Sequence, residues 1–321
     1  MIFNRYLIPI FLTVTTVLVS PSHVDANYEA RAISNRQVAA IAKKTVVRIV
    51  ASDGGFGSGV IIGRIERGNK NIYTILTAAH VVATHNLSYR IVSPILVDNL
   101  GVRKRVLINI DSQRNIKKFG DVDLATVSFE SDHTFAIGTI GNSAYADEGS
   151  PVYVAGFPKP GKAIKQVAFQ FTGGMVSSRL DESDNEPKER NDGYDLSYTN
   201  ITRAGMSGGP VLDAAGRIVA IHGQGDRDNQ APGEEASGGL PDKEKTGFNL
   251  GIPIQTFLRL QPGFSKSGGA RIDKSPVNYQ LQDRSSTIGT SHKKFIKRYR
   301  VRSEDPPILD VTKVNEETYD D

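Results

Sequence analysis

Ser207 stands in the run Gly-Met-Ser-Gly-Gly-Pro at residues 205–210 and is the residue of this chain best suited to covalent chemistry. The glycine two positions before it lets the backbone turn, so that the amides of Gly205 and Ser207 can point at one spot. Two such donors would stabilise the negative charge that develops on a carbonyl oxygen under nucleophilic attack. By itself this run is only moderately specific, since Gly-Ser-Gly-Gly also fills plain turns.

Two motifs upstream supply residues that could activate this serine. His80 ends the run Thr-Ala-Ala-His at residues 77–80, and Asp123 opens the run Asp-Leu-Ala-Thr-Val at residues 123–127. A serine hydroxyl is a poor nucleophile until a base takes its proton, and a neutral imidazole is such a base near neutral pH. A buried carboxylate can hold that imidazole in one tautomer. The three residues together predict a nucleophile, a base and an orienting acid.

The elements that must position these residues are short β-rich runs bounded by Gly, Asn or Asp, which follow a short helix capped by Ser34. The first set covers residues 46–50, 58–65, 72–77, 89–97, 102–110 and 124–129. The second set covers residues 151–157, 164–176, 194–199, 210–212, 217–222 and 248–253, and helical spacing follows at 254–260. Because no helices alternate with the strands, the pattern predicts all-β barrels or sandwiches.

Composition limits the other classes of function. Hydrophobic residues make up 39 % and charged residues 23 % of the 321, which is typical of a soluble globular protein. A net charge of +4 does not suggest nucleic acid as the main partner. The absence of cysteine excludes disulfides and thiolate sites, and the six histidines lack zinc-site spacing, so we expect no metal and no cofactor.

The N-terminal residues 1–26 have the pattern of a secretory signal peptide. Arg5 precedes an apolar run at residues 7–19, and small residues lead up to Ala26. This apolar run is shorter than the roughly 20 residues that span a bilayer. We therefore expect cleavage after Ala26, a linker at residues 27–37 and an exported protein, periplasmic or extracellular. A membrane anchor is the alternative.

The motifs around His80, Asp123 and Ser207, in that order, resemble those of trypsin-like (chymotrypsin-fold) serine proteases of the secreted bacterial type. Residues 57–62 also resemble the opening hairpin of that family. The resemblance covers residues 38–262 and implies two antiparallel six-stranded β-barrels with the active site in the cleft between them. Lobe one would span about 45–135 and lobe two about 136–262, ending in a short helix.

The resemblance implies that His80 is the general base, Asp123 its orienting acid and Ser207 the nucleophile. The amides of Gly205 and Ser207 would form the oxyanion hole. The expected activity is hydrolysis of peptide bonds in polypeptide substrates by a monomeric endopeptidase through an acyl-enzyme. Met206 departs from the animal digestive members, which carry an aspartate that pairs with a newly cut N-terminus, so we expect no activation by that route.

The expected substrate-binding residues flank the nucleophile. Thr202 and His222 resemble a pair in the glutamyl endopeptidases, where a hydroxyl and a histidine bind the substrate carboxylate. No acid stands at Ile201 or Thr202, so a salt bridge to a substrate Arg or Lys is not expected. The alternative is that His222 bonds the backbone or the Asp123 carboxylate, beside an apolar pocket with Ile201 at its base. Gly223 completes the set.

Each of these residues taken singly also fits a structural role. Ser207 suits a turn, His80 a core position and Asp123 a strand cap, with Asp121 a competing orienting acid. The alternative function is therefore a weak or inactive protease fold that serves as a binding or chaperone module at the cell envelope.

Residues 263–321 have a different character from the rest of the chain. They are predicted to form a charge-segregated, disordered tail. Its basic stretch from Lys293 to Arg302 could contact an anionic surface such as lipid headgroups.

Overall fold

The computed structural model describes residues 29–84, 86–97, 100–180, 192–227 and 245–279. The predicted signal peptide and the basic stretch from Lys293 to Arg302 lie outside the described residues. Within the described part, no helix has the length and apolar character needed to cross a bilayer.

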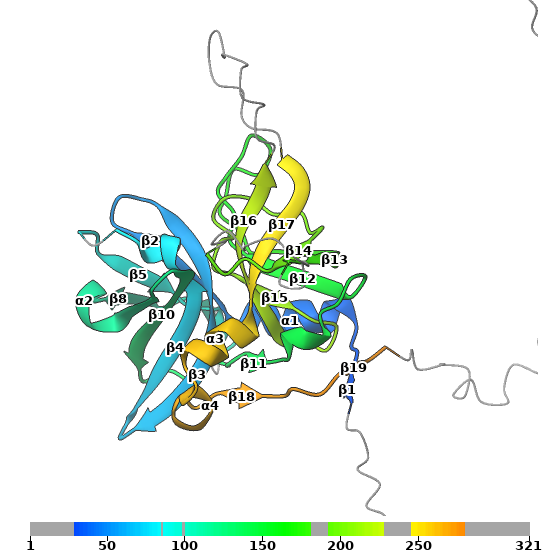
Figure 1. Ribbon diagram of the computed structural model, residues 1–321. Helices are drawn as coiled ribbons and strands as arrows, with labels where there is room; N and C mark the ends of the chain where they lie inside the picture. Colours follow the sequence, from blue (N-terminus) through cyan, green and yellow to red (C-terminus); the bar gives the residue numbers. More distant parts are fainter. Residues whose placement is uncertain (1–28, 85, 98–99, 181–191, 228–244, 280–321) are drawn as a thin grey trace, which may run out of the picture. The chain divides into compact units, whose positions relative to one another are not determined.

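Lobe one is a curled antiparallel sheet in the order β8-β5-β2-β3-β4-β10-β9 (Figure 1). Its strands are β2 (Val46–Ala51), β3 (Phe56–Arg67), β4 (Lys70–Ala78), β5 (Tyr89–Val92), β8 (Leu107–Ile110), β9 (Ile116–Phe119) and β10 (Val122–Ser131). A separate pair, β6 (Leu96–Val97) and β7 (Arg103–Lys104), and a one-turn helix, α2 (Ser112–Asn115), complete it. Inside the curl, Tyr73 stacks on Phe129 with 5.0 Å between ring centroids, which anchors an apolar core.

Lobe two is a closed six-stranded barrel. Its strands are β12 (Pro151–Gly156), β13 (Gln170–Arg179), β14 (Leu196–Tyr198), β17 (Lys245–Pro253), β16 (Ile218–Arg227) and β15 (Pro210–Leu212). The barrel closes because β15 pairs with both β12 and β16. Helix α3 (Ile254–Leu260) follows β17, and a short turn, η2 (Ser143–Tyr145), packs against α3.

The predicted fold class, an all-β double barrel with a short C-terminal helix at residues 254–260, is confirmed. Lobe one differs in detail, because its edge strands β8 and β9 are not paired with each other and the barrel stays open. The strand predicted at residues 164–176 begins only at Gln170. The sequence pattern also missed β9, whose four residues include only two apolar ones.

Two boundaries need correction. The residues predicted to be a linker at 27–37 contain β1 (Ala30–Arg31) and the start of α1 (Asn35–Thr45), whose capping box joins Ser34 and Gln37. The predicted tail also begins too early. Folded structure continues through α4 (Phe264–Ser267), β18 (Arg271–Ile272) and β19 (Val277–Asn278), and the compact unit that holds both lobes includes Tyr279.

The strap, residues 268–279, is ordered by backbone pairing. Strand β18 pairs in parallel with β11 (Thr139–Ile140) in the connection between the lobes, and β19 pairs in parallel with β1. The approach to lobe one is close, since a Cβ atom on Gly63 would lie 2.2 Å from the carbonyl oxygen of Gly268. Little apolar periodicity marks this segment, which explains why its sequence was interpreted as a tail.

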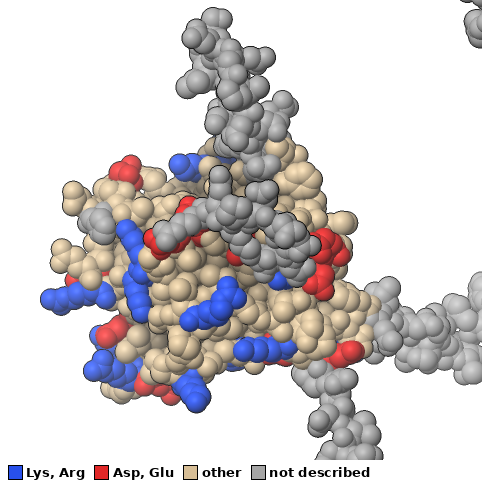
Figure 2. Space-filling model, in the orientation of Figure 1, with Lys and Arg blue, Asp and Glu red and all other residues tan. Residues whose placement is uncertain are grey.

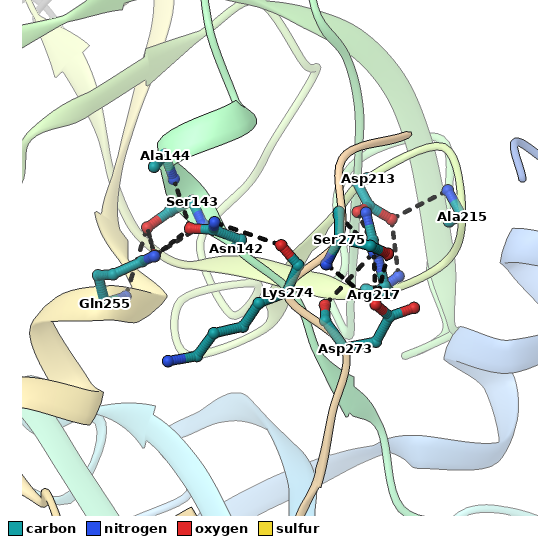
Figure 3. Close-up of polar contacts among 10 residues, drawn as sticks. All are labelled: Asn142, Ser143, Ala144, Asp213, Ala215, Arg217, Gln255, Asp273, Lys274 and Ser275. Carbon is teal, nitrogen blue, oxygen red and sulfur yellow. Dashed lines mark hydrogen bonds and ion pairs between the residues drawn. The ribbon is translucent and has the colours of Figure 1, made fainter. Parts of the chain in front are cut away.

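A buried arginine fastens the strap to lobe two (Figure 3). Arg217 is 4 % exposed, and its Nε donates to Asp213 Oδ2 at 2.8 Å. Its Nη1 donates to the carbonyl oxygen of Ser275 at 2.8 Å and lies 3.3 Å from Asp273 Oδ1. Burial raises the pKa of Asp213, against the opposing effect of Arg217. On the other side of the strap, the amide of Asn142 donates to the carbonyl oxygen of Lys274.

Replacing Arg217 should therefore destabilise the whole unit. Arg217→Met leaves the Asp213 carboxylate buried without its partner, and we expect the free energy of unfolding in urea to fall by about 3–5 kcal/mol. Arg259→Met, at an exposed position on α3, should change it by less than about 0.5 kcal/mol. Equal effects of the two substitutions would contradict a fastening role for Arg217.

Candidate active site

Strand pairing brings His80 and Asp123 together. His80 lies in the turn η1 (Ala79–Val82) directly after β4, and β10 runs antiparallel to β4 with Leu124 opposite Ala78. The backbone amide of His80 donates to Asp123 Oδ1 at 2.7 Å, and His80 Nδ1 lies 2.6 Å from Asp123 Oδ2. In a neutral imidazole, the proton therefore sits on Nδ1, which leaves Nε2 with a free lone pair.

Asp123 is the more enclosed member of this pair. Its side chain is 16 % exposed, and Oδ2 also accepts a hydrogen bond from the Tyr194 hydroxyl. Burial acts to raise the pKa of Asp123, but the hydrogen bonds from His80 and Tyr194 outweigh burial and hold that pKa below its usual value. Asp121, the competing candidate, is exposed and lines the cleft beside His80, whereas Asp123 makes the contact with the ring.

The loop before Ser207 is fixed in a shape that leaves two amides available. Gly205 and Gly208 have φ values of +93° and +83°, which favour glycine. The carbonyl oxygen of Ala204 accepts a bond from Lys159 N at 2.7 Å, so in a trans peptide the N–H of Gly205 points the opposite way. Among the described residues, neither the amide of Gly205 nor that of Ser207 finds an acceptor.

Ser58 ties this loop to lobe one, and sequence reasoning missed it. Its amide donates to the carbonyl oxygen of Ser207 at 2.8 Å, and its hydroxyl donates to that of Gly205 at 2.8 Å. The same hydroxyl accepts a bond from Phe157 N at 2.9 Å. A serine within the apolar first half of β3, residues 56–62, is the signal that could have identified it, because a buried hydroxyl needs partners.

His80 and Ser207 line one open cleft of about 310 Å³, together with Gly205, Phe56 and other residues. The Ser207 hydroxyl donates to the carbonyl oxygen of Gly223 at 2.8 Å and not to the imidazole. A hydrogen bond between serine and histidine would need another χ1 rotamer. A second cleft, of about 530 Å³, is lined by His80, Asp123, Tyr194 and Gly223 among other residues.

The four expected substrate-binding residues lie in different surroundings. Ile201 is 76 % exposed, so it does not form the base of a pocket. Thr202 is buried, and its hydroxyl donates to Asn249 Oδ1. His222 is 2 % exposed and its Nδ1 lies 2.7 Å from the Tyr198 hydroxyl, while Asp123 Oδ2 contacts His80 and Tyr194. Gly223 contacts Ser207 as described above.

The depressed pKa of Asp123 predicts a pH-dependent contribution to stability. Because the folded-state pKa is below the unfolded value of about 3.9, the stabilisation is complete above the unfolded pKa and is lost as pH falls through the folded pKa. We expect Asp123→Asn to lower the free energy of unfolding in urea at pH 7 and to lower it less at pH 3. An equal loss at both pH values would contradict this linkage.

Comparisons with curated sequences and solved structures bear on the fold of this chain. A search of curated protein sequences gave no match. Among solved structures, a crystal structure of Deg5 is 21 % identical, covers 73 % of this chain and 95 % of its own, and has a TM-score of 0.49. The HtrA-type protease AlgW with a tripeptide is 18 % identical, covers 74 % of this chain and 65 % of its own, with a TM-score of 0.50; at that identity the likeness concerns the fold alone.

The sequence itself carries the family assignment. Residues 57–221, just over half of the chain, match the trypsin-like peptidase domain. This range begins in β3 next to Ser58 and ends one residue before His222, so it includes His80, Asp123 and Ser207. The chain belongs to the trypsin-like peptidase domain family.

Proposed function

We propose that this chain is an exported serine endopeptidase that hydrolyses polypeptide substrates through an acyl-enzyme on Ser207. The observation that carries the proposal is the His80–Asp123 pair, held at 2.6 Å beside a cleft that His80 shares with Ser207. Both residues of the pair come from lobe one, and Ser207 comes from lobe two. Family membership supports the same class of reaction.

In the proposed reaction, the Ser207 hydroxyl leaves the carbonyl oxygen of Gly223 and donates to His80 Nε2. As Oγ attacks the carbonyl carbon of the substrate, the imidazole takes its proton, and Asp123 stabilises the imidazolium that forms. The imidazolium then protonates the leaving amine. Water attacks the resulting ester with the same histidine as base, which releases the acid and restores Ser207.

The free amides of Gly205 and Ser207 would bind the oxyanion of each tetrahedral intermediate. Removal of one such donor typically costs about 2.7–4 kcal/mol in transition-state stabilisation, which makes this a large contribution. Ser58 acts indirectly here, because its hydroxyl donates to the carbonyl oxygen of Gly205 and so fixes the orientation of that peptide group.

The surroundings of Met206 support activity that does not depend on a newly cut N-terminus, unlike that of the animal digestive members. The Met206 side chain is fully buried in the core of lobe two, where it packs among apolar residues. No charged group at this position requires an ammonium partner. Loop geometry is instead fixed by the bonds to Ser58 and Lys159.

Export and a monomeric state complete the proposal. Export to the periplasm or the exterior rests on the pattern of residues 1–26. On the face shown in Figure 2, Lys and Arg side chains are dispersed among acidic and uncharged ones.

The alternative, a weak or inactive fold that serves as a binding module, is favoured only by the hydrogen bond from Ser207 to Gly223.

Ser207→Ala should abolish peptide hydrolysis and leave the fold intact. We expect kcat to fall about a millionfold, as in other serine triads. A fluorophosphonate probe should label the wild-type protein and Ser177→Ala but not Ser207→Ala, since Ser177 pairs with Ser197 on another part of the barrel. Retention of most activity in Ser207→Ala would refute the proposal, and an unlabelled, inactive wild type would favour the binding module.

Primary specificity for glutamate is the finer proposal for Thr202 and His222. The Thr202 hydroxyl would have to leave Asn249 Oδ1 before it could donate to a substrate carboxylate. The Tyr198 hydroxyl donates to the carbonyl oxygen of Leu250 at 3.2 Å, so His222 Nδ1 donates to Tyr198 and a substrate carboxylate would need a protonated Nε2. We expect kcat/KM for matched peptides to favour Glu over Phe, Leu or Arg at the cleaved residue, and His222→Ala to abolish this preference. A preference for Arg would contradict the carboxylate pocket.

A further inference from the structure

A short segment of lobe two reaches the candidate acid on lobe one at two points. The carbonyl oxygen of Asp192 accepts a hydrogen bond from Asp123 N at 2.9 Å. Two residues later, the hydroxyl of Tyr194 donates to Asp123 Oδ2, the same oxygen that faces His80 Nδ1. Backbone and side chain of Asp123 are therefore both held by one turn from the opposite lobe.

The turn at Asp192 and Gly193 has two consecutive residues with positive φ. Asp192 has a φ of +45°, and it is the single non-glycine residue with a positive φ in the described part of the chain. Gly193 follows with a φ of +86°, and a Cβ atom there would lie 2.8 Å from a methyl of Val122. Gly adopts such a conformation freely, and Asp is among the few other residue types that adopt it. Here it aims the Asp192 carbonyl and the Tyr194 ring at Asp123.

Tyr194 also contacts the serine side of the cleft. A Cβ atom on Gly223 would lie 2.0 Å from the Tyr194 hydroxyl oxygen and 2.1 Å from a ring carbon, so glycine is required at 223 while the phenol occupies this place. The carbonyl oxygen of Gly223 accepts the Ser207 hydroxyl. The Tyr194 ring thus packs against Gly223, which accepts the Ser207 hydroxyl, and the Tyr194 hydroxyl bonds Asp123, which contacts His80.

We propose that Tyr194 is a positioning residue of the active site, which orients the Asp123 carboxylate toward His80 from across the cleft. This inference rests on the proposed function for its effect on rate, but the contact exists independently of any reaction. Burial and the Asp123 carboxylate raise the pKa of Tyr194, so the phenol stays protonated and serves as a donor. Neither its sequence context nor the three motifs mark this tyrosine.

The test compares Tyr194→Phe with Tyr153→Phe, a matched variant whose lost hydroxyl bonds Asn35 Oδ1 far from the cleft. Phenylalanine keeps the ring and removes one donor to a charged group. We expect kcat on a peptide substrate to fall roughly tenfold in Tyr194→Phe with KM unchanged, because substrate contacts are retained and orientation of the base is loosened. Tyr153→Phe should keep both constants.

A second measurement needs no activity. In proton spectra of the Ser207→Ala protein, the His80 Nδ1 proton and the Tyr194 hydroxyl proton should give separate, strongly downfield exchangeable signals, since both bond one carboxylate oxygen. Adding Tyr194→Phe should remove one signal and shift the other, and adding Tyr153→Phe should leave both in place.

These two readouts separate the possible failures. An inactive wild type with the expected spectral change would overturn the proposed function and retain the Tyr194–Asp123 contact. An unmoved His80 signal in Tyr194→Phe, or wild-type kcat in that variant, would overturn the positioning role.

Discussion

A buried carboxylate needs hydrogen-bond donors around it. At Asp123 these donors come from both lobes, from His80 in lobe one and Tyr194 in lobe two. Its oxygens accept bonds from the His80 amide, the His80 ring and the Tyr194 hydroxyl, and its own amide donates to the carbonyl oxygen of Asp192. Burial alone would favour the protonated acid, which lacks the negative charge that stabilises an imidazolium. The anion persists because donors from both sides of the cleft stabilise it, so the geometry of the base depends on how the lobes meet.

The loop that carries Ser207 in lobe two is in turn held by a residue of lobe one. Ser58 belongs to lobe one, yet it bonds the carbonyl oxygens of Gly205 and Ser207 and the amide of Phe157, all in lobe two. Each lobe thus supplies the contacts that shape the functional residues of the other. A cleft built by such reciprocal contacts tolerates little relative movement, and the strap fastened by Arg217 adds a further link outside the cleft.

Much of this protein is determined by local sequence. Twelve β-rich runs bounded by Gly, Asn or Asp predict strands, and each run overlaps at least one strand of the structure. The Ser34 cap and Gln37 specify the start of α1, and the runs around His80, Asp123 and Ser207 identify the candidate residues and their family. Glycines at 205 and 208 indicate a turn with positive φ, which the backbone adopts.

Tertiary structure decided the rest. Tyr194 has no local signature, because its partner Asp123 lies 71 residues away along the chain. The partners of Ser58 in the nucleophile loop and of Arg217 in the strap lie 147 and 58 residues away. The strap at residues 268–279 lacks an apolar pattern and is ordered by pairing with β11 and β1, which no short window of sequence contains. His222 and Thr202 were identifiable as residues, but their bonds to Tyr198 and Asn249 were not. Sequence specifies the groups that can react, and long-range packing decides which donors hold them in place.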